Sequence, residues 1–190
     1  MTRIIVLTSG KGGVGKSSMS INIGYALAKK GAKVCLIDAD FGLKNLDVMM
    51  GLENRVIYDL KDVIQSKCTL QQILVKDKRM HSLFLLPACK SLSLENLNVE
   101  YMIKMIEELK KDFDYILIDS PAGIEKGFQY ASGLSNEAII VVTLDIVSLR
   151  DADRVVGLLL KQGVNNLHMI VNKYNEDDVH KGRSLTLKDA

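Results

Sequence analysis

Residues 9–18 read SGKGGVGKSS, a glycine-rich stretch between an apolar run and a helical pattern. From Gly10 to Ser17 it fits G-x-x-x-x-G-K-[ST], the spacing of a phosphate-binding loop. The glycines let successive backbone N–H groups turn inward around phosphate oxygens, because no Cβ stands in the way. The N-terminus of the following helix adds partial positive charge. The stretch therefore predicts a nucleotide phosphate site between a strand and a helix.

Outward from this loop, short apolar runs alternate with helical patterns along the chain of 190 residues. Six runs are predicted as strands: Arg3–Thr8, Lys33–Asp38, Leu83–Pro87, Tyr115–Asp119, Ala138–Thr143 and His168–Asn172. Helical spacing is found over Ser17–Lys30, Val99–Lys111 and Leu149–Gln162. Strands that are apolar throughout are typical of a parallel sheet covered on both faces, with right-handed crossovers. The prediction is an α/β fold, a three-layer αβα P-loop NTPase with a mainly parallel sheet, in a single domain over residues 1–190.

Composition narrows the class of protein. A net charge of +2 with 47% hydrophobic residues suits a globular protein and gives no electrostatic case for nucleic-acid binding. Cys35, Cys68 and Cys89 form no C-x-x-C pair, which favours a reduced, intracellular protein. The sequence has no signal peptide and no run of transmembrane length, so we expect the cytoplasm or its membrane surface. The last residues, SLTLKDA, begin like a capped helix, with Thr186 followed by Asp189, so we expect the domain to continue beyond them.

Two residues at the end of the loop are suited to binding a phosphate group and a metal ion. Lys16 is placed to reach the β- and γ-phosphates of a nucleotide, and the Ser17 hydroxyl to bind Mg²⁺. Both belong to the predicted catalytic and metal site of a nucleotide hydrolase. The predicted nucleotide-binding residues are Gly10, Lys11, Gly12, Gly13, Val14, Gly15, Lys16, Ser17, Ser18 and Asn172.

Acidic residues follow two of the predicted strands. The run VCLIDAD ends in Asp38 and Asp40, and YILIDSP places Asp119 at the end of another strand. The carboxyl ends of parallel strands meet at the edge where ligands bind, so we expect these carboxylates near the metal and the attacking water. Asp38 and Asp119 are predicted to belong to the Mg²⁺ shell, Asp119 through a water. Asp40 and Asn45 are predicted to orient the attacking water.

The run VNKYN, residues 171–175, follows the last predicted strand and is similar to the guanine-reading N-K-x-D motif. Asn175 stands where that motif needs an acid, and an amide lacks the two acceptor oxygens that guanine requires. Asn172 can instead pair with the edge of adenine through its own amide. ATP is therefore favoured over GTP, and the reaction is hydrolysis to ADP and phosphate. The alternative, in which Asn172 only caps the end of a strand, stays open.

The loop holds a second lysine, Lys11, which needs its own explanation. It lies too early in the loop to fold back easily onto the phosphates that Lys16 reaches, but it could cross to the nucleotide of a neighbouring subunit. The pattern K-G-G-x-G-K-[ST] is the deviant Walker A motif. Together with DADFGLKNLD and DSPAGIE it resembles the MinD/ParA family of ATPases, over Thr2 to about Asn175.

The resemblance implies an ATP-sandwich homodimer in which Lys11 of each subunit touches the other's phosphates. It also implies switch loops at Asp38–Asp47 and Asp119–Glu125. It is closest to the ATPases that place the division septum of bacteria and plastids. In these proteins the ATP-bound dimer binds the inner face of the cell membrane and recruits the division inhibitor MinC, and MinE stimulates hydrolysis. The resemblance places membrane binding in an amphipathic C-terminal helix beyond these residues.

The run SLRDADR resembles the partner-binding helix of the family, which makes Asp151 and Asp153 candidates for contacts with MinC and MinE. The alternative is that both are solvated acids on a helix surface. The chain departs from the family after its fifth strand, where Thr-Pro-Glu is common and Thr143-Leu144-Asp145 stands here. The acid is one methylene shorter and the proline is lost, so a contact to a second subunit at this point is left open.

Three other functions compete with septum placement. A ParA-type DNA-partitioning ATPase should show a basic surface, which the small net charge disfavours. An iron–sulfur carrier of the same superfamily is disfavoured by the lack of a C-x-x-C pair. A flagellar-number ATPase stays open as an alternative.

Overall fold

The computed structural model describes residues 1–40, 46–88 and 98–190, and its centre is a seven-stranded sheet. The strand order is β3-β4-β2-β5-β1-β6-β7. Among the described residues every pairing is parallel except that of β3 with β4. The strands are β1 (Arg3–Thr8), β2 (Val34–Asp38), β3 (Val75–Lys76), β4 (Leu83–Leu86), β5 (Tyr115–Asp119), β6 (Glu137–Val142) and β7 (Asn166–Val171).

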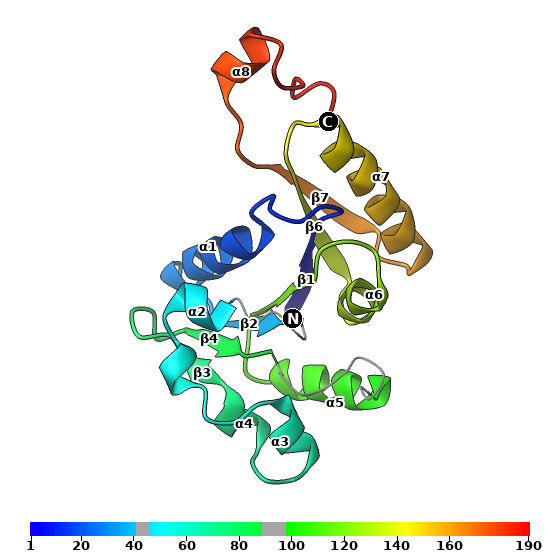
Figure 1. Ribbon diagram of the computed structural model, residues 1–190. Helices are drawn as coiled ribbons and strands as arrows, with labels where there is room; N and C mark the ends of the chain where they lie inside the picture. Colours follow the sequence, from blue (N-terminus) through cyan, green and yellow to red (C-terminus); the bar gives the residue numbers. More distant parts are fainter. Residues whose placement is uncertain (41–45, 89–97) are drawn as a thin grey trace.

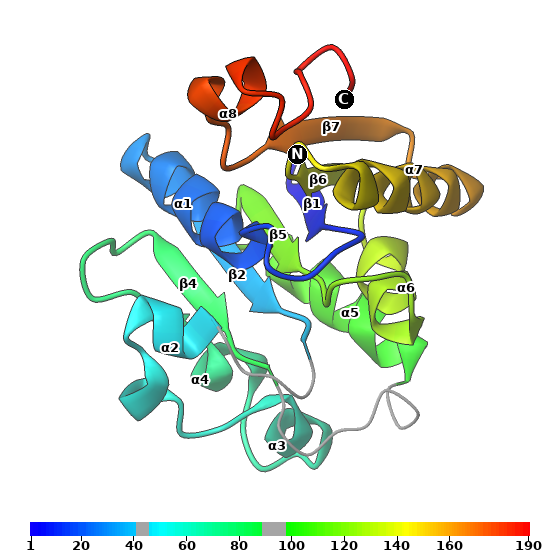
Figure 2. The same ribbon diagram turned by 45° about the horizontal axis from the view of Figure 1, so that its top comes forward.

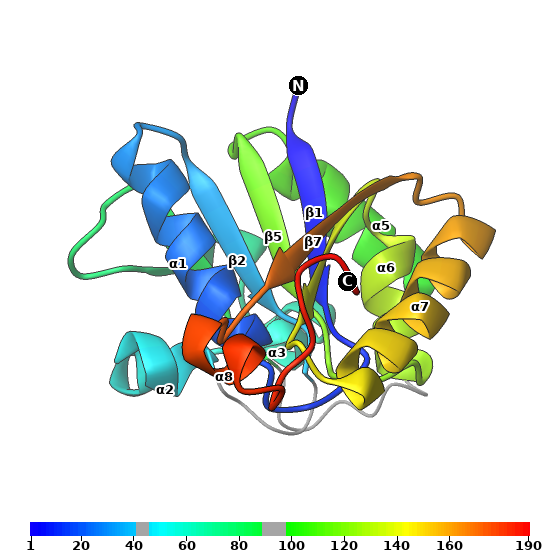
Figure 3. The ribbon, with the colours of Figure 1, turned by 90° about the horizontal axis from the view of Figure 1, so that it is seen from above.

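Helices cover both faces of this sheet, which confirms the predicted three-layer αβα P-loop NTPase fold (Figures 1 and 3). One face carries α1 (Lys16–Lys29) and α2 (Leu46–Met50). The other carries α5 (Val99–Leu109), α6 (Lys126–Gly133) and α7 (Ile146–Lys161). The shorter elements are η1 (Glu53–Arg55), α3 (Leu60–Ile64), α4 (Leu70–Ile73) and α8 (Glu176–His180).

The two cores follow from the period of two along each strand, since successive side chains point to opposite faces of a sheet. In β1, Ile5 and Leu7 pack toward α1, whereas Ile4 and Val6 pack toward α5 and α6. The central strands β2 and β5 divide in the same way, and most of their residues are fully buried. Burial on both faces is the reason these strands read as continuous apolar runs.

The strand order brings the ends of β1, β2 and β5 to one edge of the sheet. β5 lies between β1 and β2, and its register pairs Asp119 with Asp38 at the last position of both strands. The loop that leaves β1 at Thr8 passes over this edge and enters α1, as Figure 2 shows. The topology therefore places the glycine-rich loop and the two strand-end carboxylates together.

The structure corrects several predicted boundaries. β6 begins at Glu137, one residue before the prediction, because the Glu137 carboxylate accepts two hydrogen bonds from Arg3 on β1 and so can lie in a strand. β7 covers Asn166–Val171 rather than His168–Asn172. α7 begins three residues early, at Ile146, because Asp145 caps it. The other expected ends match or differ by at most two residues. The elements that were not expected are β3, α6 and the short helices α2, η1, α3, α4 and α8.

The C-terminal residues form a turn and not the helix that Thr186 and Asp189 predicted. The predicted pair does form, since the Asp189 carboxylate accepts from the backbone N–H and the hydroxyl of Thr186 at 2.8 and 2.7 Å. These contacts hold the pKa of Asp189 below its ordinary value. In the described parts of the chain, no helix combines the length and the apolar character that crossing a membrane requires.

Candidate nucleotide site

The glycine-rich loop takes a conformation that side chains would oppose. Gly13 and Gly15 have φ angles of 77° and 95°, in the left-handed region that favours glycine. Gly15 immediately precedes α1, so the loop leads directly into the N-terminus of a 14-residue helix. Among the described residues, the N–H groups of Val14 and Gly15 have no hydrogen-bond acceptor of ordinary geometry. This arrangement of free donors at a helix N-terminus is suited to phosphate oxygens.

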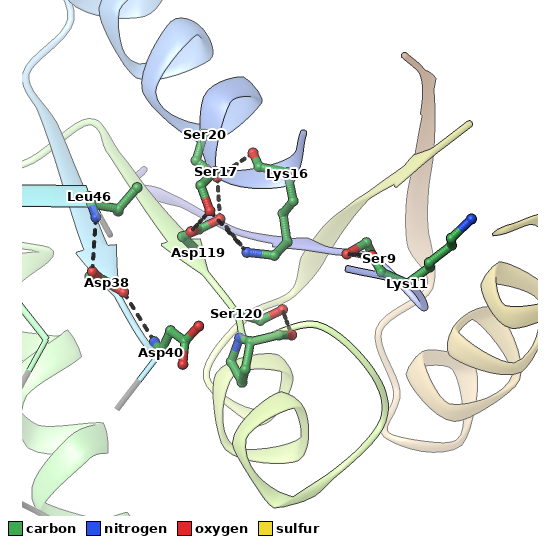
Figure 4. Close-up of polar contacts among 11 residues, drawn as sticks. Ser9, Lys11, Lys16, Ser17, Ser20, Asp38, Asp40, Leu46, Asp119 and Ser120 are labelled. Atoms are coloured by element: carbon green, nitrogen blue, oxygen red, sulfur yellow. Dashed lines mark hydrogen bonds and ion pairs between the residues drawn. The ribbon is translucent and has the colours of Figure 1, made fainter. Parts of the chain in front are cut away.

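Asp119 accepts hydrogen bonds from three side chains at the start of α1 (Figure 4). Its Oδ1 accepts from the Lys16 ammonium at 2.9 Å and from the Ser20 hydroxyl at 2.7 Å. Its Oδ2 accepts from the Ser17 hydroxyl at 2.7 Å. Lys16 is only 8% exposed and Asp119 2%, so an opposite charge is needed beside each. The structure thus brings together three of the four residues predicted for phosphate and metal chemistry, Lys16, Ser17 and Asp119. The fourth, Asp38, accepts from the backbone N–H groups of Asp40 and Leu46.

Ser20 belongs to this cluster and was not identified from the sequence. It is fully buried and lies one turn after Lys16 on α1, with its hydroxyl on Asp119. The spacing of four residues on a helix that starts at the loop could have revealed it, because such residues share a face. Ser18, in contrast, lies between them on α1 without joining the carboxylate.

The donor set around Asp119 fits Mg²⁺. A hydroxyl and a carboxylate are hard oxygen ligands, and Mg²⁺ is held by one or two protein oxygens together with the phosphates of a nucleotide. Within the residues that the structure describes, no group of three acidic, histidine or cysteine side chains could hold a metal by itself. A divalent ion at Ser17 and Asp119 would therefore depend on a bound nucleotide for its remaining ligands.

Asp38 is buried at the end of β2 and receives backbone donors from the residues that follow it. Its Oδ1 accepts from the N–H of Asp40 at 3.1 Å and its Oδ2 from the N–H of Leu46 at 3.2 Å. Asp38 thus holds both ends of the segment between β2 and α2, and Asp40 lies beside it at the edge of the site (Figure 4). Asn45 falls outside the described residues, as does half of the predicted first switch loop, residues 41–45.

Lys11 lies apart from this cluster. Its side chain points away from Lys16 and Asp119 (Figure 4), and its ammonium is 3.3 Å from the Asp145 carboxylate. Asp145 is the N-cap of α7 and accepts from the backbone N–H of Ser148 at 3.0 Å. The pKa of Asp145 lies below its ordinary value, mainly because its carboxylate accepts a hydrogen bond from the Thr143 hydroxyl. The Ser148 N–H and Lys11 lower this pKa further, whereas burial raises it. The carboxylate that replaces the family's glutamate is therefore ionised beside Lys11.

Helix α7 also touches the start of the loop. A Cβ on Gly10 would meet the backbone of Asp151 at 2.5 Å, so Gly10 allows α7 to approach the loop. The Asp151 carboxylate lies 3.9 Å from the guanidinium groups of Arg150 and Arg154. Asp153 is exposed and lines a groove of about 410 Å³ with Ile124. The two predicted partner residues therefore differ: Asp151 lies against the loop, and Asp153 faces outward.

The loop after β5 connects the cluster to this groove. The N–H of Gly123 donates to the Ser9 carbonyl at 2.9 Å, and the next residue, Ile124, is 41% exposed at the groove. The predicted second switch loop thus touches the phosphate loop at one residue and the α7 groove at the next.

At the end of β7, the predicted base reader contacts the loop itself. The Asn172 amide donates to the Val14 carbonyl at 2.8 Å, and the Lys173 ammonium to the Gly13 carbonyl at 2.8 Å. Asn175 caps α8, accepting from the N–H of Asp177 at 3.0 Å. The cavity that Lys173 lines, of about 500 Å³, also includes Lys11 and Asp145. Lys173 was not identified from the sequence, although it belongs to the run that was singled out.

Comparison with known proteins agrees with this geometry. A family model described as ParA, NUBPL iron-transfer P-loop NTPase, matches residues 1–180. The chain is 50% identical over 189 residues to the septum site-determining protein MinD of Synechocystis, covering 100% of this chain and 71% of that protein. It is 46% identical over 191 residues to MinD of Bacillus subtilis, again covering 100% and 71%.

Solved structures show the same likeness. The MinC:MinD cell division protein complex of Aquifex aeolicus matches with 49% identity and a TM-score of 0.90, covering 99% of this chain and 75% of that one. MinD of Pyrococcus horikoshii complexed with Mg-ADP matches with 30% identity and a TM-score of 0.83, covering 100% and 76%. A plasmid partition protein of Borrelia burgdorferi, 21% identical with a TM-score of 0.76 over 95% and 82%, shares the fold alone.

Proposed function

Since this chain belongs to the ParA family of P-loop NTPases, and within it to the MinD proteins, we propose that it is an ATP-dependent dimerising switch that places the division septum. In the proposal, the ATP-bound dimer recruits a MinC-type inhibitor to the membrane, and a MinE-type protein stimulates hydrolysis. The observation that carries it is the match, at 49% identity, to a MinD solved in complex with MinC. The buried cluster of Lys16, Ser17 and Asp119 supports the nucleotide part.

For nucleotide binding, we assign each member of the cluster one role. Lys16 provides the ammonium that meets the β- and γ-phosphates of ATP, and the loop N–H groups surround the same oxygens. Ser17 and Asp119 would hold Mg²⁺, which supplies charge neutralisation on the phosphates when bound. Ser20 keeps the Asp119 carboxylate in place through its 2.7 Å bond. The Pyrococcus MinD with Mg-ADP supports this choice of cofactors.

For hydrolysis, Asp40 and Asn45 are proposed to orient the attacking water. Asp38 supports this role by fixing the N–H of Asp40 and of Leu46 with its two oxygens. Lys11 is proposed to act on the nucleotide of a second subunit, because its ammonium lies beside Asp145 and away from Lys16 of its own chain. Closing of a dimer would then require Lys11 to leave Asp145.

For partner binding, the α7 groove is the proposed site of the MinC-type protein. Asp153 and Ile124 line it, and Ile124 follows directly on the residue whose N–H bonds the phosphate loop at Ser9. A change in the loop on nucleotide binding can therefore reach the groove through Gly123. Asp151 acts indirectly in this proposal, since its backbone packs on Gly10.

The proposed location is the cytoplasm, bacterial or plastid, and the inner face of the membrane in the ATP state. Membrane attachment is assigned to a C-terminal amphipathic helix outside these 190 residues. Iron transfer, which the family description names, is not proposed for this chain, because Cys35 is buried within β2 and the sequence holds no C-x-x-C. DNA partition is the second candidate function, and the only support for it is a fold shared with a plasmid partition protein.

The test is nucleotide-dependent assembly. Molecular mass measured by light scattering should double with ATP and Mg²⁺ but not with ADP, and the ATP form should bind the MinC-type protein of the same organism. Lys16→Ala should weaken ATP binding at least tenfold, because a charge-assisted phosphate contact is lost. ATP-dependent binding to DNA without binding to MinC would instead favour the partition function, and unchanged ATP affinity in Lys16→Ala would contradict the nucleotide site.

A further inference from the structure

The run at the end of β7 has a role that base reading does not explain. Asn172 and Lys173 are consecutive, and each donates to a carbonyl of the glycine-rich loop, at Val14 and Gly13 respectively. Both bonds are 2.8 Å long. They join residues separated by almost the whole domain, at positions that are themselves consecutive in the loop. Two neighbouring side chains therefore hold two neighbouring peptide groups.

The geometry of the peptide bond gives these contacts a consequence. In a planar trans peptide, the C=O of one residue and the N–H of the next point in opposite directions. Holding the Gly13 carbonyl toward Lys173 turns the Val14 N–H away from it, and holding the Val14 carbonyl toward Asn172 does the same for the Gly15 N–H. Both N–H groups, like those of Gly12 and Gly13, have no ordinary acceptor among the described residues. The two side chains thus set the direction in which the loop presents its phosphate donors.

The backbone at Lys173 is strained at the residue that makes this contact. Its φ is +55°, in the left-handed region that a lysine rarely adopts. Such conformations persist where surrounding contacts over-determine them, and they gather at functional sites. Neither a glycine nor an asparagine at this position could make the ammonium bond to the Gly13 carbonyl.

Packing at Asn172 supports the same role. A Cβ on Gly15 would collide with the Asn172 amide nitrogen, so the loop and the end of β7 fit closely at this point. Asn175, the position of the base-reading acid in the guanine motif, is engaged in capping α8. The run VNKYN therefore faces the phosphate loop with its first two polar residues and α8 with its last.

We propose that Asn172 and Lys173 are positioning residues that pre-orient the Val14 and Gly15 N–H groups for the phosphates. The proposal rests on the proposed function, in that it needs the loop to bind a nucleotide. It adds a second role for Asn172, because one N–H of its amide donates to the loop, whereas pairing with adenine would use the other N–H and the carbonyl oxygen. It also adds Lys173, which the sequence did not indicate, as a determinant of phosphate affinity.

The test compares ligands with and without a base. Isothermal titration of the wild-type chain, Lys173→Met and Asn172→Ala would use ATP, ADP and tripolyphosphate. Loss of a hydrogen bond from a charged donor should weaken all three ligands about tenfold in Lys173→Met. Lys181→Met is the matched control, since Lys181 is exposed, lies close in sequence and carries the same charge. Its affinities should equal those of the wild type.

Two further measurements separate orientation from strain and from base reading. Lys173→Gly adopts a positive φ freely, so its melting temperature should not fall, yet its affinities should drop as in Lys173→Met. In amide NMR spectra, tripolyphosphate should shift the Val14 and Gly15 signals less in both variants than in the wild type. Retained affinity in Lys173→Gly, or a loss confined to ATP and ADP in Asn172→Ala, would overturn the proposal. Failure of the wild type to bind ATP would instead overturn the nucleotide site itself.

Discussion

At the scale of single residues, the site combines one shared carboxylate with a loop that packs closely at two of its glycines, Gly10 and Gly15. Lys16, Ser17 and Ser20 share the Asp119 carboxylate, and two P-loop carbonyls are held from β7. Gly10 is part of this fit for a reason that the phosphate motif does not give. Its missing Cβ makes space for the α7 backbone and not for a ligand.

Gly10→Ala should therefore destabilise the fold. The new methyl group would lie 2.5 Å from a backbone carbon of Asp151, so α7 or the loop must shift, at a cost of roughly 1–3 kcal/mol for overpacking. Urea denaturation in the absence of nucleotide would measure this. Gly12→Ala is the control, since its Cβ meets nothing within 4 Å and its φ is not in the left-handed region. Equal unfolding free energies for the two variants would contradict the packing role of Gly10.

Asp40→Ala should bind ATP almost as well as the wild type but hydrolyse it at least a hundredfold more slowly. The proposed role of the carboxylate is to act on the water, which affects the transition state and not the bound phosphates. A fluorescent-nucleotide titration paired with phosphate release separates the two effects. If affinity and turnover fell by the same factor, Asp40 would be a binding residue.

At the scale of secondary structure, what the sequence could predict depended on burial. The central strands β1, β2 and β5 were predicted within one residue, because burial on both faces leaves a continuous apolar signal. The missed α6, KGFQYASG, contains two glycines and three further weak helix formers, Phe128, Tyr130 and Ser132, and the missed β3 has only two residues. Helices of four or five residues, such as α2 to α4, are too short for a period of 3.6 to show.

The same reasoning applies to the site. Lys16, Ser17 and Asp119 were predicted to lie together because a loop motif and a strand end each carry a local signal. Ser20 and Lys173 were missed because their roles come from contacts across the domain, with Asp119 and with the Gly13 carbonyl. A serine in a helix and a lysine after a strand are common on protein surfaces, so neither residue indicates a function in the sequence. Only the packing of α1 and β7 against the loop gives them a function.

Glu137, which the apolar pattern excluded from β6, should make stability depend on pH. Its carboxylate accepts two hydrogen bonds from the Arg3 guanidinium on β1, which hold its pKa below the ordinary value of 4.5. A lowered folded-state pKa contributes stability that is present above the unfolded-state pKa and is lost as the pH falls through the folded-state value.

Glu137→Gln should therefore cost about 1–2 kcal/mol at pH 7, since Arg3 is half-exposed, and progressively less below about pH 4. Denaturation with urea across this pH range measures the difference. Glu107→Gln, on an exposed ion pair with Lys110, is the control and should change stability little at any pH. A cost that stayed constant with pH would show that Glu137 acts by packing alone.

At the scale of the whole molecule, the two lysines of the loop serve two different sites. Lys16 is buried beside Asp119 of its own chain, whereas Lys11 is 44% exposed beside Asp145 and lines the cavity between the loop and α8. An ammonium held at the surface by an exposed carboxylate can be transferred to a stronger anion at little cost, because such surface pairs are weak. The phosphates of a facing subunit are such an anion.

If Lys11 acts in this way, Lys11→Ala should keep most of its ATP affinity but remain monomeric with ATP. A cation supplied by a partner is worth roughly 10³–10⁵ in the rate of phosphoryl transfer, so hydrolysis by the dimer should be almost abolished. The mixture with Asp40→Ala is decisive. Asp40→Ala subunits cannot hydrolyse their own ATP but keep Lys11, which reaches the nucleotide of a Lys11→Ala subunit in the mixed dimer. Phosphate release should then exceed the sum of the two variants measured alone. If Lys11→Ala dimerises and hydrolyses ATP by itself, or if the mixture shows no gain, Lys11 does not act across the interface.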